Sequence, residues 1–135
     1  MGVDYSATSG YGFAIAEEDL ADVAERVGYV NPYAEDDDGW IDAYDLGDFL
    51  TKDTSLAYEN VGNLMVGDDI YLIIIASSTA HSVDWRYDFG LKRFGDLEIS
   101  EREQQDLDKV HELVYGEGAS GDDDCIGWML AMTVS

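Results

Sequence analysis

The stretch "IYLIIIAS", residues 70–77, decides the fold of this chain. It is an almost unbroken apolar run rich in β-branched residues, which favour strands over helices. A strand with one buried face alternates polar and apolar residues, whereas an unbroken run indicates burial on both faces. The run is also far too short to cross a membrane as a helix. We therefore expect 70–77 to be a central strand of a sheet that is covered on both sides.

Four further segments of the chain predict strands. Residues 10–15, "GYGFAI", place Tyr11, Phe13 and Ile15 on one side, as a strand with one buried face does. The other three segments are 54–66, which we expect to be irregular at Gly62, then 82–89 and 125–135. Residues 67–69, "GDD", predict the turn between two of these strands. We expect 125–135 to be a buried terminal strand.

Two segments have the apolar spacing of amphipathic helices. Residues 16–28 carry a helical stripe that Gly28 should end, and 100–116 begin with Ser100 and Glu103 at capping-box spacing. Strands and helices in this order predict an α+β fold in a single domain covering residues 1–135. We expect a mostly antiparallel sheet of about four to six strands with two main helices on one face.

The charge of the chain is strongly negative. Thirty Asp and Glu residues face seven Lys and Arg residues, which gives a formal net charge of −23 among 135 residues. DNA, RNA and anionic membranes would repel such a surface, whereas a basic protein would be attracted to it. We therefore expect neither direct nucleic-acid binding nor membrane binding.

Localisation is predicted from the single cysteine and from the first residues. Cys125 has no second cysteine with which to form an intrachain disulfide, which fits a reducing compartment. The opening "MGVDYSATSG" has neither the basic nor the apolar region of a secretory signal. We expect a cytoplasmic protein.

The most acidic part of the chain includes "AEDDDGWIDAYDLGDFL", residues 34–50. If 42–50 is helical, Asp42, Asp45 and Asp48 recur along one side of the helix, and Glu17, Glu18, Asp22 and Glu25 of 16–28 could extend the row. Such a row imitates the regular negative charges of a nucleic-acid backbone. An aromatic residue among the acids suits an interface with a desolvated anchor. The predicted partner-binding residues are Asp36, Asp37, Asp38, Trp40, Asp42, Asp45 and Asp48.

Two other interpretations of these acids stay open. With Gly39 at its sixth position, the loop 34–45 partly matches an EF-hand, and the ligands of a Ca²⁺ ion would be Asp36, Asp38, Asp42 and Asp45. Ala34 stands at the first position, where that loop requires an oxygen ligand. Alternatively, abundant acids and few lysines are typical of a salt-adapted protein of unrelated function.

Catalytic signatures do not emerge from the sequence. "GYGFAI" lacks the third glycine of a dinucleotide-binding loop, and there is no Gly-x-Ser-x-Gly elbow. His81 and His111 do not have the spacing of metal ligands. We expect the protein not to be an enzyme and to need no cofactor, apart from the Ca²⁺ alternative.

The two ends of the chain, "MGVDYSATSGYGFAI" and "IGWMLAMTVS", resemble the ends of small, uncharacterised bacteriophage proteins. The resemblance implies a phage accessory protein made in a bacterial cytoplasm. Such proteins often neutralise a host enzyme or a defence system, as anti-CRISPR and anti-restriction proteins do, and acidic ones often imitate DNA. With the charge, this implies an inhibitor that blocks a basic nucleic-acid-binding host protein. The oligomeric state stays open.

Overall fold

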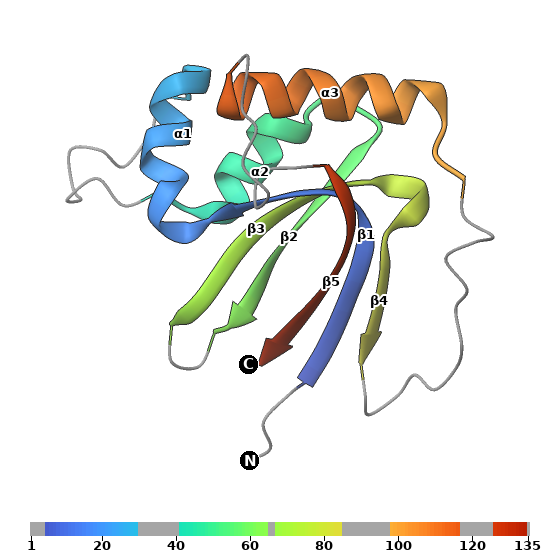
Figure 1. Ribbon diagram of the computed structural model, residues 1–135. Helices are drawn as coiled ribbons and strands as arrows, with labels where there is room; N and C mark the ends of the chain where they lie inside the picture. Colours follow the sequence, from blue (N-terminus) through green and yellow to red (C-terminus); the bar gives the residue numbers. More distant parts are fainter. Residues whose placement is uncertain (1–4, 30–40, 65–66, 85–97, 117–125, 135) are drawn as a thin grey trace.

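The computed structural model describes residues 5–29, 41–64, 67–84, 98–116 and 126–134. The elements in chain order are β1 (Tyr5–Ala16), the 3-10 turn η1 (Glu17–Asp19), α1 (Leu20–Val27), α2 (Ala43–Thr51), β2 (Leu56–Asn63), β3 (Asp68–Ala76), the 3-10 turn η2 (Ser77–Thr79), β4 (His81–Asp84), α3 (Glu101–Tyr115) and β5 (Gly127–Val134). The helices lie together on one face of the sheet (Figure 1). This is the predicted α+β fold, with the short α2 added to the two helices that we expected.

The sheet is organised by the long strand β1, which has different neighbours along its length. Residues 12–16 pair antiparallel with β3, and residues 6–9 pair antiparallel with β4 on the same edge. The other edge pairs antiparallel with β5 over residues 5–12. A β2–β3 hairpin then completes the sheet, and the end of β2 meets the end of β5 in parallel at 62–63 and 133–134.

β3 has the central place that the sequence predicts. It pairs with both β1 and β2, and the residues 72–76 are at most 2% exposed. Leu72 and Ile74 belong to the main core beneath the helices, whereas Ile73 and Ile75 pack on the opposite face against Val61. The predicted irregularity of β2 at Gly62 is also confirmed, because the register with β3 shifts there.

Two carboxylates fasten α3 to the sheet. Glu103 closes the predicted capping box with Ser100 and also accepts hydrogen bonds from the backbone N–H and the hydroxyl of Ser78, at 2.9 and 2.8 Å. Asp106 accepts from the N–H and hydroxyl of Ser55 at 2.8 and 2.6 Å. Burial alone would raise the pKa of Glu103, but the hydrogen bonds outweigh it and lower that pKa. The hydrogen bonds from Ser55 likewise lower the pKa of Asp106.

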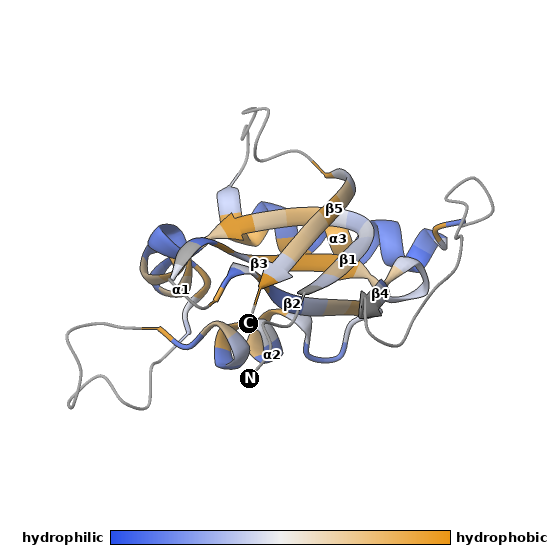
Figure 2. Ribbon diagram, turned by 90° about the horizontal axis from the view of Figure 1, so that it is seen from below, coloured by the Kyte–Doolittle hydropathy of each residue, from blue (hydrophilic) through white to orange (hydrophobic). Residues whose placement is uncertain are grey.

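The prediction that β5 is buried is wrong for one of its faces. Trp128, Leu130 and Met132 are 45%, 70% and 58% exposed, while Met129 and Ala131 pack against the smaller core on the opposite face. The reason is that the described helices do not extend over β5, so the face of β5 that carries these three side chains stays uncovered by them (Figure 1). The colouring by hydropathy in Figure 2 shows hydrophobic residues along much of β5.

The remaining strand predictions differ from the structure at their ends. The predicted turn 67–69 is shorter, because β3 already begins at Asp68. Of the predicted strand 82–89, residues 82–84 belong to β4 and 85–89 lie outside the described residues, as does Cys125. His81 lies in β4, and His111 packs on α3 against the ring of Phe13 at 5.1 Å.

Candidate functional site

Three of the predicted partner-binding residues lie on α2. Asp42 caps the helix by accepting from the N–H of Tyr44 at 2.8 Å, Asp45 lies in the first turn, and Asp48 accepts from the hydroxyl of Tyr58 at 2.7 Å. The row of carboxylates depended on the condition that 42–50 is helical, and residues 43–51 do form a helix. It holds the three carboxylates in a row at successive steps of three residues.

The aromatic ring of Tyr58, on β2, lies among these carboxylates. Its ring packs directly on α2 at Gly47, where an added Cβ would lie 2.4 Å from the ring atom Cδ2. The exposed ring of Tyr44 meets it edge-on, with centroids 6.4 Å apart. Burial, the hydrogen bond to Asp48 and the negative charge of that carboxylate raise the pKa of Tyr58 to about 12. The hydroxyl is thus held in place as a donor to Asp48.

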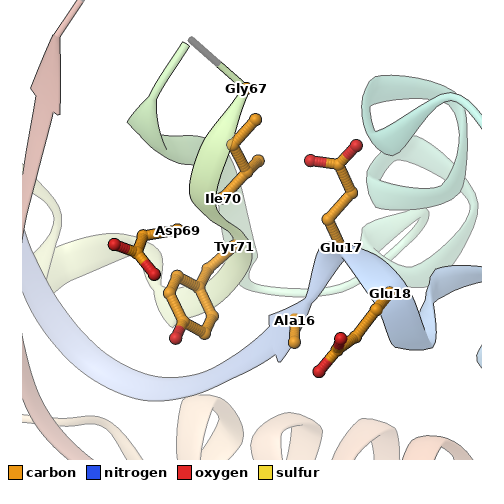
Figure 3. Close-up of a pocket in the computed structure, with 7 residues that line it drawn as sticks. All are labelled: Ala16, Glu17, Glu18, Gly67, Asp69, Ile70 and Tyr71. Atoms are coloured by element: carbon orange, nitrogen blue, oxygen red, sulfur yellow. The ribbon is translucent and has the colours of Figure 1, made fainter.

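A first acidic hollow of about 430 Å³ lies between η1 and the start of β3. Its wall carries the carboxylates of Glu17, Glu18 and Asp69, together with Ile70 and Tyr71 (Figure 3). In Figure 3, Glu17 extends on the side of Ile70, whereas Glu18 extends on the side of Tyr71. None of the described residues that line this hollow is a lysine or an arginine. Its chemistry suits a cationic group.

A second acidic hollow of about 210 Å³ adjoins the first and shares Glu17 and Ile70 with it. Asp42 and Tyr44 of α2 lie on its far wall. The side-chain oxygen of Asn60, which also lines it, is buried and has no hydrogen-bond partner among the described residues.

The two hollows share Glu17, and the second hollow reaches Asp42 and Tyr44 at the start of the α2 row. We define the acidic face by seven residues of η1, α2 and β3, which are Glu17, Glu18, Asp42, Tyr44, Asp45, Asp48 and Asp69. The sequence suggested four acids that could extend the α2 row. Of these, Glu17 and Glu18 belong to the acidic face, while Asp22 and Glu25 are exposed on α1. Asp69 comes from the predicted turn, and its place beside η1 depends on the pairing of β1 with β3, which sequence spacing does not show.

The other predicted residues of the acidic stretch lie outside the described residues. These are Asp36, Asp37, Asp38 and Trp40, so the loop 34–45 is described only from Ile41 onward. Of the predicted Ca²⁺ ligands, Asp42 acts as the N-cap of α2 and Asp45 lies within that helix. Across the segments that the structure describes, no group of three or more His, Cys, Asp or Glu side chains is arranged to hold a metal ion.

Sequence reasoning missed one further carboxylate, on the opposite face of β2. Glu59 accepts hydrogen bonds from the hydroxyls of Thr8 and Ser82 at 3.0 and 3.3 Å and so ties β2 to β1 and β4. The period of a strand places Glu59 and its neighbour Tyr58 on opposite faces. Glu59 therefore points away from α2 and its row of carboxylates, although it follows Tyr58 directly in the sequence.

Comparisons with known proteins give no relative for this fold and face. No protein-family model matches the chain, and neither does any curated protein or solved structure. Among the described helices, none is long and apolar enough to cross a membrane.

Proposed function

We propose that this chain is a non-enzymatic binding protein whose acidic face occupies the nucleic-acid-binding surface of a basic protein. In this proposal it is a phage-encoded inhibitor that acts in a bacterial cytoplasm on an enzyme or defence protein that binds DNA or RNA. One observation carries the proposal. Carboxylates from η1, the start of α2 and β3 line two adjoining hollows together with Tyr44 and Tyr71, and no described lysine or arginine lines these hollows.

The chemistry of the acidic face matches the groups that proteins use to hold phosphates. A nucleic-acid-binding surface presents lysines and arginines to a regular row of negative charges. The α2 row offers such charges on a rigid helix, and a guanidinium group forms strong charge-assisted hydrogen bonds with carboxylates. Tyr44 and Tyr71 are 53% and 41% exposed and offer ring faces to the same cations. The net charge of −23 would also accelerate the encounter.

The test is capture of proteins from bacterial lysate at low salt by the intact chain, followed by displacement with duplex DNA or RNA. The face variant replaces Asp42, Asp45 and Asp48 with Asn, which keeps the N-cap of α2 and an acceptor for Tyr58. The matched control removes the same charge from exposed positions of α3, through Glu101→Gln, Asp108→Asn and Glu112→Gln.

We expect the chain to capture a nucleic-acid-binding protein that added nucleic acid and salt both release. Three screened contacts of about 0.5 kcal/mol each predict a loss of about tenfold in affinity for the face variant and little change for the control. Equal losses of affinity in both variants would mean that binding depends on the net charge of the chain and not on the acidic face. A captured protein that still binds its nucleic acid while attached would contradict the proposal.

A further inference from the structure

The three described helices line a further hollow of about 310 Å³, and none of the seven residues that define the acidic face belongs to it. Its apolar wall consists of Val27 at the end of α1, Phe49 and Leu50 of α2, and Val110 and Leu113 of α3. Leu50 and Val110 are buried, whereas Phe49 and Leu113 are 44% and 49% exposed. Two large hydrophobic side chains therefore face solvent at this hollow.

Two lysines line the same hollow, which distinguishes it from the two acidic hollows. Lys52 follows the end of α2, and Lys109 lies one turn before Leu113 on α3. Both lysines are exposed, and neither ammonium forms a hydrogen bond or an ion pair with another residue in the described segments. The charge of Lys109 only adds to the hydrogen bonds from Ser55 in lowering the pKa of Asp106. Both ammonium groups can therefore hold an anion from outside the chain.

The acids on the wall of this hollow limit the charge that it accepts. Asp53 and Asp106 also line it, so its described wall carries two positive and two negative charges. The carboxylate of Asp106 already accepts two hydrogen bonds from Ser55 and forms an ion pair with Arg102, which reduces its repulsion of a further anion. A single negative charge therefore suits this wall better than a doubly charged phosphate. More distant acids of the chain matter less, because salt screens charges beyond about 8 Å at physiological ionic strength.

We propose that this hollow binds a small amphipathic carboxylate, with its apolar chain on Phe49 and Leu113 and its head group at Lys52 and Lys109. Ligand sites are mostly apolar, with a few polar groups that fix the orientation of the ligand. At roughly 30 Å³ for each heavy atom, the volume of a water molecule in the liquid, the hollow holds about ten heavy atoms. A carboxylate with about eight carbon atoms has this size. This inference does not depend on the proposed function.

Octanoate is the probe, and three related compounds isolate its parts: octanol lacks the charge, octylamine reverses it, and acetate lacks the chain. Octanoate added to the intact, isotope-labelled chain should shift the NMR signals of the methyl groups of Val27, Val110 and Leu113. The shifts should saturate with a dissociation constant of about 1 mM, as expected for a ligand of this size. The three related compounds should bind at least about tenfold more weakly, because each lacks either the charge or the apolar contacts.

Variants separate the charged from the apolar contacts. Lys52→Gln combined with Lys109→Gln should weaken octanoate binding by about tenfold and leave the weaker binding of octanol unchanged. Leu113→Ser should weaken the binding of both compounds by about fivefold. Leu130→Ser is the matched control, since Leu130 is an exposed leucine of β5 outside the hollow, and it should change neither. All these residues are exposed, so the variants should fold, which circular dichroism checks.

Several results would overturn the inference. These are methyl shifts that do not saturate, octanol or octylamine binding as tightly as octanoate, a lysine variant that keeps full affinity, or equal effects of Leu113→Ser and Leu130→Ser. The proposed function is tested separately. The variant with Asn at 42, 45 and 48 should bind octanoate at least as tightly as the wild type, whereas the lysine variant should still capture the nucleic-acid-binding protein from lysate.

Discussion

Replacing Glu103 with Ala should destabilise the protein by about 3 kcal/mol. The side chain is only 5% exposed and accepts from Ser78 and from the N–H of Ser100. The capping box contributes about 1 kcal/mol, and the hydrogen bonds from Ser78 to a charged acceptor contribute roughly 1.5–3 kcal/mol. For a domain of this size the loss corresponds to a decrease in Tm of about 10 °C. Glu101→Gln, on the exposed first turn of the same helix, should change stability by less than about 0.5 kcal/mol.

The pH dependence of Glu103→Gln isolates the charge of this carboxylate. Because the folded state lowers the pKa of Glu103, its stabilisation is fully present above the unfolded pKa of about 4.3 and is lost as the pH falls through the folded pKa. The difference in the free energy of unfolding between wild type and variant should therefore be constant above about pH 5 and shrink below it. Urea unfolding followed by circular dichroism measures this difference.

The wild-type curve alone would not suffice, because protonation of thirty acids also relieves the repulsion within the chain at low pH. Only the comparison of the two proteins separates Glu103 from that background. A loss below about 1 kcal/mol for Glu103→Ala, or a difference that does not change with pH, would refute the role of Glu103 in fastening α3 to η2.

Three further predictions concern single positions and the total charge. Asp48→Asn should lower the pKa of Tyr58 from about 12, and a phenolate titration with Tyr58→Phe as the reference measures the change. The stabilisation linked to the raised pKa of Tyr58 is present below about pH 10 and is lost as the pH rises toward 12. Gly12→Ala should prevent folding or lower the free energy of unfolding by more than about 3 kcal/mol, because the added Cβ would lie 1.8 Å from the carbonyl oxygen of Ile74. Gly127 pairs with Gly12 but has open space around it, so the thermal unfolding of Gly127→Ala should stay close to that of the wild type. Raising NaCl from about 0.05 to 0.5 M should increase the free energy of unfolding measured by urea titration, because salt screens the net charge of −23; no increase would contradict significant self-repulsion.

The regular elements were accessible from the sequence because their signals are local. The unbroken run at 70–77 predicts the doubly buried β3, and the Ser100 and Glu103 spacing predicts the start of α3. The exposure of one face of β5 could not be predicted from the sequence, because "GWMLAMTV" has the composition of a buried strand. Whether such a strand is covered depends on where the helices stop, and that is a property of the whole sheet.

The candidate site was accessible only in part, for a similar reason. The row on α2 follows from helical periodicity within one segment. The contributions of Glu17 and Asp69 do not, because η1 and the start of β3 are brought together by pairing between distant strands. The contact of Tyr58 with Gly47 likewise joins β2 to α2 through packing. Long-range pairing therefore determines how far the acidic face extends.

Four of the seven bases lie in the described residues, and their placement fits the proposed binding face better than a uniform acidic coat of the kind that salt adaptation favours. On α3, Arg102 lies among acids and forms an ion pair with Asp106 at 3.8 Å. The guanidinium of Arg26, in the last turn of α1, instead donates to the carbonyl of Val114, and Lys52 lies in a hollow with Lys109 of α3. Neither Arg26 nor Lys52 lines the two hollows of the acidic face. A binding face of the proposed kind must attract the lysines and arginines of a partner, and bases of the chain itself beside it would oppose that attraction.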